Sequence, residues 1–164
     1  MPEIVTRSGN RLWEEQFLSE YLAAKRPEAR VMFKIRLGPQ GVTNPDPTLT
    51  ESERRMLGAA FRRWADAILV DRGTLVVVEA AMVPDPRDIS LVQTYLLLVD
   101  HTPELRMLAD LPRRGLLVWA VDDPYSRAVA VAAGLEVDVW KPSHFGEWLA
   151  AKRARETRPA RTLD

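Results

Sequence analysis

Apolar residues recur along this chain with two different periods. Over residues 10–26 they fall at helical spacing, and the buried stripe of this helix is expected to be formed by Trp13, Phe17, Tyr21 and Leu22. Over residues 30–37 they alternate with polar residues, which predicts a strand whose buried face is formed by Val31, Phe33, Ile35 and Leu37. Pro27 separates the two elements, because proline cannot continue a helix.

A second helix is predicted after a loop rich in glycine, proline and asparagine at residues 38–47. The capping sequence Thr-Glu-Ser-Glu at residues 50–53 begins this helix, which is expected to run to about residue 63. Its inward face is expected to hold Met56, Leu57, Ala60, Phe61 and Trp64. Its outward face carries four arginines, Arg54, Arg55, Arg62 and Arg63.

Two apolar runs follow, and the turn residues Asp71-Arg72-Gly73 between them predict a β-hairpin. The first run covers residues 65–71 and the second residues 74–82. Because the second run is almost continuously apolar, we expect it to be a central strand, buried on both faces.

The rest of the chain returns to alternating helices and strands. We expect helices at residues 88–99, 102–109, 124–133 and 143–155, and strands at residues 115–121 and 135–140. The resulting order, α-β-α-β-β-α-α-β-α-β-α, predicts one α/β domain over residues 1–155 with a mixed central sheet flanked by helices. Residues 156–164 are expected to form a basic flexible tail.

The amino-acid composition limits the metal ligands and the binding surfaces that this chain can offer. The 164 residues include no cysteine and only two histidines, His101 and His144, which we expect to be surface or capping residues. Carboxylates and carbonyls are therefore the natural metal ligands, and they suit Mg²⁺, Mn²⁺ or Ca²⁺. The 23 basic and 23 acidic residues balance, so a DNA-binding surface would have to be a local patch. With no signal peptide pattern and no apolar run of membrane-spanning length, we expect a cytoplasmic location without membrane association.

Two acids stand out in the predicted hairpin. Asp66 lies at the start of the first apolar run, and Glu79 lies near the end of the second. Pairing of the runs would bring both carboxylates to one end of the sheet, where they repel unless a cation lies between them. Glu79 follows Leu-Val-Val-Val, so its charge needs a partner or a metal. The simpler interpretation is that both are strand-end acids in water or in ion pairs with neighbouring arginines.

This arrangement resembles the PD-(D/E)XK nuclease superfamily, which includes restriction enzymes, Holliday-junction resolvases and RecB-type nucleases. Asp66 matches the acid of the first motif strand, and Glu79-Ala80-Ala81 stands where the family has Asp/Glu-x-Lys. Gln93 and Tyr95 resemble the Gln-x-x-x-Tyr element of the RecB-like branch with a shorter spacing. Either Glu14 or Glu15 is placed like the helix glutamate of the resolvases. The pattern is also similar to small nuclease-fold proteins of tailed bacteriophages.

The resemblance implies a restriction-endonuclease-like fold and metal-dependent hydrolysis of DNA. Mg²⁺ or Mn²⁺ would be held by Asp66, Glu79, the carbonyl of Ala80 and Glu14, with Gln93 positioning a ligand. The four arginines of the second helix would contact DNA phosphates, or would otherwise form a solvated face paired with Glu51 and Glu53.

Position 81 departs from the family, because alanine stands where the lysine should be. The lysine has been replaced deliberately, or lost by nature, or its role has passed to another cation. Lys34 is the preferred substitute in the last case, ahead of Arg36 and Arg87.

Three functional hypotheses follow. The first is a Mg²⁺-dependent deoxyribonuclease whose cleavage is impaired or absent. The second is a catalytically dead nuclease fold that serves as a structural or interaction module in a DNA-handling complex or a phage particle, where it would contact phage structural proteins and be virion-associated. The third is an unrelated α/β protein in which Asp66 and Glu79 merely end two strands, Tyr95 is a core residue and Glu14 and Glu15 face water.

Overall fold

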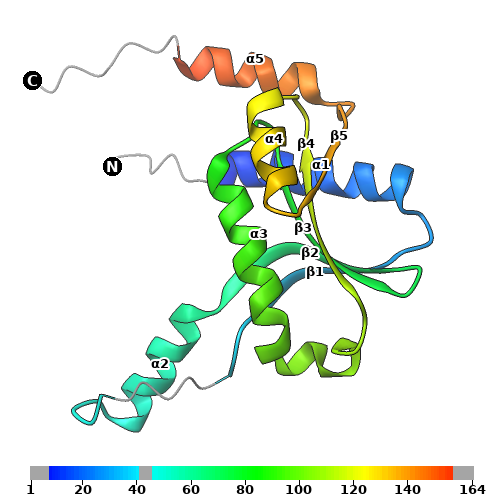
Figure 1. The fold of residues 1–164 in the computed structure, drawn as a ribbon. Coiled ribbons are helices and arrows are strands. Elements are labelled where there is room, and N and C mark those ends of the chain that lie inside the picture. Colours follow the sequence, from blue (N-terminus) through cyan, green and yellow to red (C-terminus); the bar gives the residue numbers. More distant parts are fainter. Residues whose placement is uncertain (1–7, 41–45, 157–164) are drawn as a thin grey trace, which may run out of the picture.

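The computed structural model describes residues 8–40 and 46–156, which form one α/β domain (Figure 1). Its helices are α1 (Ser8–Lys25), α2 (Glu51–Phe61), α3 (Pro86–Leu98), α4 (Pro124–Ala132) and α5 (Phe145–Glu156), with the short 3₁₀ helices η1 (Val99–His101) and η2 (Pro103–Leu108). Its strands are β1 (Arg30–Leu37), β2 (Arg63–Asp71), β3 (Thr74–Ala81), β4 (Arg113–Trp119) and β5 (Glu136–Val139).

The five strands form one mixed sheet in the order β1-β2-β3-β4-β5. The first three strands pair antiparallel, whereas β3–β4 and β4–β5 pair parallel. The α/β class, the mixed central sheet and the central position of β3 are therefore as the apolar pattern predicted. The edge position of β5 also agrees with its shorter, alternating sequence.

Helices cover both faces of the sheet and create two cores. On one face Phe17 and Tyr21 of α1 and Trp148 of α5 pack against the sheet. On the other face α3 packs with Val92 and Tyr95, and α4 packs with Ala130. Figure 1 shows α1 and α3 on opposite sides of the strands.

The packing of α3 on the sheet is close at Gly115 of β4. A Cβ atom on this glycine would lie 2.5 Å from Cγ1 of Val92 and 2.6 Å from Cδ2 of Leu135. Since interiors are packed at near-crystalline density, no side chain fits at this position without displacing its neighbours.

The turn between β2 and β3 fixes the register of the hairpin. Arg72 and Gly73 have φ angles of 48° and 77°, the left-handed pair that a two-residue turn of type I′ requires. Asp71 pairs with Thr74 at the turn, and the ladder runs to the pair of Ala67 and Val78. Asp66 and Glu79 are the next residues of the two strands, so the turn determines that they meet.

The strand β1 departs from simple alternation at Lys34, whose φ angle is 53°. Opposite this residue the side-chain order of β2 changes face: Ala67 packs in the core under α1, but Ala65 packs in the core under α3. The prediction of one continuous buried face for β1 is therefore wrong, and Phe33 is 49% exposed. A left-handed residue within a strand rotates the chain, which period-2 counting does not anticipate.

The second helix is shorter and less buried than predicted. α2 ends at Phe61, and Arg63 already belongs to β2. Met56 and Trp64, expected to face inward, are 65% and 49% exposed. Figure 1 shows the reason, because α2 projects away from the sheet as an arm and finds no layer to pack against.

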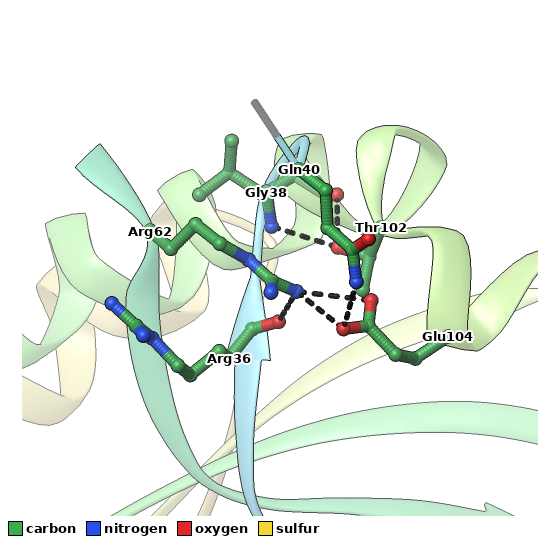
Figure 2. A network of polar contacts seen from close by, with 7 residues as sticks. Arg36, Gly38, Gln40, Arg62, Thr102 and Glu104 are labelled. Atoms are coloured by element: carbon green, nitrogen blue, oxygen red, sulfur yellow. Dashed lines mark hydrogen bonds and ion pairs between the residues drawn. The ribbon is translucent and has the colours of Figure 1, made fainter. Parts of the chain in front are cut away.

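Arg62 anchors the base of this arm (Figure 2). Its guanidinium donates to the backbone carbonyl of Arg36. It also donates to both carboxylate oxygens of Glu104, at 2.9 Å to each. Nearby, the N–H of Gly38 donates to the hydroxyl of Thr102 at 2.8 Å. The Arg62 side chain is only 10% exposed, so its predicted role on an outward phosphate-binding face is wrong.

The C-terminal elements follow the prediction with two differences. The helix expected at residues 102–109 is a 3₁₀ segment, η2, which begins at Pro103. α5 continues through the basic residues to Glu156, so the start of the predicted tail is helical and residues 157–164 lie outside the described part of the chain. Within the described residues, no helix is long and apolar enough to cross a membrane.

Candidate functional site

Asp66 and Glu79 lie beside each other at the ends of β2 and β3. The backbone N–H of Ala80 donates to Oδ2 of Asp66 at 3.0 Å, and the backbone N–H of Asp66 donates to the carboxyl group of Glu79. These two contacts cross-link the strands where the regular ladder ends. The hairpin thus brings the two acids together, as the sequence predicted.

The carboxyl group of Glu79 occupies an unfavourable environment for a charge. Its Oε2 atom is buried and has no hydrogen-bond partner among the described residues. Burial is the main cause that raises the pKa of Glu79 to about 9, and the nearby charges of Asp66, Asp88 and Glu14 raise it further. Without a counter-cation, Glu79 therefore binds a proton at neutral pH.

Asp88 is a third acid of this cluster, which the sequence pattern placed only at the start of a predicted helix. It lies in the first turn of α3, where Oδ2 is buried and has no hydrogen-bond partner among the described residues. Burial first, and then the charge of Asp85, raise the pKa of Asp88 to about 6. A signal was present, because Asp88 precedes Val92, Tyr95 and Val99 at the spacing of the buried stripe of α3.

Asp66 and Asp88 border an open cavity of about 940 Å³, whereas Glu79 is not among the residues that line it. Asp66, Asp88, Glu14 and Ala81 line it, so the position where the resemblance expects a lysine faces the same space. The other lining residues are Arg63, Trp64, Val83, Asp85, Arg87, Ser90, Leu91 and Thr94. The site therefore combines elements that are distant in sequence, with Glu14 from α1, Asp66 from β2, and Asp88 from α3.

The three cations considered as substitutes for the missing lysine each have another contact. Lys34 forms an ion pair with Glu15, with Nζ 2.8 Å from Oε1. The guanidinium of Arg36 lies 5.1 Å from the ring centre of Trp64. Arg87 lines the cavity, but its guanidinium pairs with Asp85 in the same turn, with Nη2 2.6 Å from Oδ2.

The remaining predicted residues divide between the site and the rest of the molecule. Gln93 is exposed on α3 and is not among the residues that line the cavity. Tyr95 is buried, and burial followed by the charges of Glu79 and Asp66 raises its pKa. The structure therefore brings Tyr95 near the acids but leaves Gln93 in water.

Of the four arginines, Arg63 is the one that lines the cavity. On the α2 arm, Arg54 is half-buried and Arg55 is exposed, with Nε 3.5 Å from Oε1 of Glu51. The four arginines therefore do not form one surface beside the acids. The helix ends before Arg62, and the turn into β2 separates Arg63 from the arginines of the arm.

His101 is exposed as expected, whereas His144 is not a surface residue; it precedes α5, and its carbonyl accepts a hydrogen bond from the N–H of Trp148 at 3.0 Å. The ring of His144 is buried, is stacked on Trp13, and lies within hydrogen-bond range of the Trp13 carbonyl and the Glu20 carboxylate. Tertiary contact with α1 accounts for this burial, and the residue lies outside the acid cluster.

The donor set suits a hard divalent cation, because carboxylate oxygens are the ligands that Mg²⁺ and Mn²⁺ prefer. The partnerless oxygens of Glu79 and Asp88 also fit a cation. In the described part of the chain, however, no three acidic, histidine or cysteine side chains are placed together so that they could hold a metal ion. The residues therefore fit a divalent cation in the chemistry of their donor atoms, but the described residues do not form a complete ligand set.

Comparison with known proteins adds little. No protein family model matches the chain, and no curated protein matches it. One similar solved structure is a crystal structure of the protein of unknown function AF1548. It has 9% sequence identity and a TM-score of 0.49, over 92% of this chain and 70% of the other.

Proposed function

We propose that this protein is a divalent-cation-binding phosphodiester hydrolase fold that acts on DNA, with cleavage impaired by the alanine at position 81. The observation that carries the proposal is the buried carboxyl of Glu79, which lies beside Asp66 and Asp88 and has an oxygen with no hydrogen-bond partner among the described residues. Acids that are buried close together destabilise a fold, and groups perturbed in this way cluster at functional sites. A divalent cation would offset the repulsion between the acids and would contact the oxygen of Glu79 that has no hydrogen-bond partner.

Different side chains of the site would bind the cation and the phosphate. Asp66 and Glu79 would hold the cation, with Glu14, Asp88 or the carbonyl of Ala80 as further oxygen ligands. When bound, such an ion polarises a phosphate and lowers the pKa of a water molecule. Arg63, exposed at the cavity, would hold the phosphate backbone and offset the negative charge of the site.

Impaired cleavage follows from the surroundings of Ala81. A methyl group at this position cannot orient a water molecule or neutralise charge that develops on a phosphate. Losing one such electrostatic contact typically costs on the order of 10²–10³ in rate. Lys34 and Arg87 are engaged by Glu15 and Asp85, which argues against transfer of the role to either of them.

The second candidate is a catalytically silent fold that acts as a structural or interaction module, in the cytoplasm or in a phage particle. Two observations favour it, the alanine at position 81 and the α2 arm. This arm projects from the domain with Met56 exposed (Figure 1), which suits a contact with another protein. In this case the acids would be a remnant of a former metal site.

Metal binding separates the two candidates. Mg²⁺ or Mn²⁺ at 100 times its dissociation constant should stabilise the protein by about 2.7 kcal/mol, or roughly 5–10 °C in the unfolding midpoint. The double variant Asp66→Asn/Glu79→Gln should lose this shift, whereas the exposed control Glu147→Gln on α5 should keep it. Equal midpoints with and without metal would reject a cation site.

The variant Ala81→Lys then tests the chemistry. It should nick supercoiled plasmid DNA in Mg²⁺ at a rate above that of the parent chain, and Asp66→Ala in the same background should abolish the gain. A folded Ala81→Lys protein that binds Mg²⁺ but does not cut would refute the hydrolase proposal, and one that neither binds metal nor cuts would support the structural module.

A further inference from the structure

A second hollow, of about 310 Å³, lies beside the acid cluster, between α1 and the strands β1 and β2. Asp66, Glu14 and Trp64 line both this hollow and the larger cavity. Whatever occupies the hollow therefore lies next to the carboxylates. The residues that line the hollow indicate which part of a substrate it could bind.

Two aromatic side chains, Phe33 and Trp64, form part of these walls, and each is 49% exposed. The change of face at Lys34 brings them to the same hollow from neighbouring strands. Large aromatic rings are usually placed to bury area, so two half-exposed rings beside a charged site are not explained by packing. They offer a ligand flat apolar surfaces.

The guanidinium of Arg36 lies over the ring of Trp64, 5.1 Å from its centre. This cation–π contact covers one face of the ring with a positive charge. Arg63 precedes Trp64 in the chain and lines the larger cavity. A basic residue therefore lies beside the aromatic residue, as a strand of nucleic acid requires for its base and its phosphate.

The polar groups of the hollow disfavour an anion inside it. Glu14, Glu15 and Asp66 contribute carboxylates, and the one lysine among the lining residues, Lys34, is paired with Glu15 at 2.8 Å. Carboxylate oxygens and the hydroxyl of Ser19 can instead accept hydrogen bonds from amino groups on a ring edge. The hollow thus suits a flat, neutral ring that carries hydrogen-bond donors.

We infer that this hollow binds an unpaired nucleobase of single-stranded DNA, stacked against Trp64 and Phe33, while the adjacent phosphate faces the carboxylates. The inference rests on the proposed function and names its substrate class as a single strand or a frayed end. A base inside a duplex is already stacked and paired, and it presents no free face to Trp64.

The test measures the affinity of the full chain for fluorescein-labelled oligodeoxycytidylate, whose bases carry an amino group, by fluorescence anisotropy in Mg²⁺, with gel electrophoresis to confirm that the strand stays intact. Trp64→Ala should weaken binding roughly 5- to 100-fold, the range expected for loss of one stacked base. Trp64→Phe keeps an aromatic face and should stay near the parent affinity. Tyr125→Ala, which removes an 84% exposed aromatic residue on α4, is the matched control and should have no effect.

A blunt duplex of the same length should bind more weakly and should not depend on Trp64. The same comparison with oligocytidylate, which differs only in its sugar, tests discrimination between RNA and DNA, and a Trp64-dependent affinity for either strand supports base stacking. Equal single-strand affinity of the parent and of a folded Trp64→Ala variant would overturn the inference. So would a loss of affinity in Trp64→Phe as large as in Trp64→Ala.

Failure of the inference is distinguishable from failure of the proposed function. If Mg²⁺ stabilises the chain but the oligonucleotide affinity does not depend on Trp64, the cation site is supported and the base site is refuted. If the chain binds oligodeoxycytidylate through Trp64 but is not stabilised by Mg²⁺, the base site is supported and the hydrolase proposal is refuted.

Discussion

Replacement of Glu79 by glutamine tests whether the acid cluster is electrostatically strained. The side chain keeps its shape but no longer ionises, so the variant should be more stable than the parent chain at neutral pH in the absence of metal. The gain should depend on pH, because it comes from a proton that folded Glu79 must bind and unfolded Glu79 releases.

The magnitude follows from the two pKa values. An ordinary glutamate titrates at 4.5, whereas the pKa of Glu79 is raised to about 9 in the fold. The folded state binds the proton more tightly than the unfolded state does. The contribution of Glu79 to the free energy of unfolding is therefore fully present below pH 4.5 and is lost as the pH rises towards 9. Each pH unit above 4.5 removes about 1.4 kcal/mol, so the loss at pH 7 amounts to a few kcal/mol.

The assay is urea unfolding at several pH values between 5 and 8.5. The difference between Glu79→Gln and the parent chain should be small at pH 5 and should grow by about 1.4 kcal/mol per pH unit. Because the readout is a change with pH, a constant effect of the amide group on stability cancels.

Glu20→Gln is the matched control with the opposite sign. Hydrogen bonds from the backbone and hydroxyl of Ser143 are the main reason that the pKa of Glu20 is lowered to about 2. Its folded and unfolded pKa values both lie below the assay range, so this variant should be less stable than the parent chain, and the difference should not grow by about 1.4 kcal/mol per pH unit. Parallel stability curves for Glu79→Gln and the parent chain would refute the strained-cluster argument.

Two further predictions concern the framework. Gly115→Ala should lower the free energy of unfolding by about 1–3 kcal/mol through overpacking, whereas Gly146→Ala, with open space around its Cβ position, should raise it by up to about 1 kcal/mol; equal effects in urea unfolding would contradict the close packing. Arg62→Gln should cost about 1–2 kcal/mol, because Glu104 loses a charge-assisted partner, and should speed amide hydrogen exchange at Gly38; unchanged exchange there would show that Arg62 does not anchor the α2 arm.

The sequence by itself determined the order of the elements and the meeting of the two main acids. Period-2 and helical spacing located the strands and helices, because burial of one face imposes those periods on any chain. The turn at Arg72 and Gly73 fixed the register of the hairpin, and with it the position of Asp66 beside Glu79. These features are local, so local rules were sufficient.

Only the tertiary structure decided what surrounds those acids. Asp88 joins the cluster because α3 packs across the sheet, and Arg62 becomes buried because the base of the α2 arm meets Glu104. The rotation of the chain at Lys34 placed Trp64 at the surface of the site rather than in a core. The physical reason is that burial and electrostatic environment depend on residues distant in sequence, which no local pattern encodes.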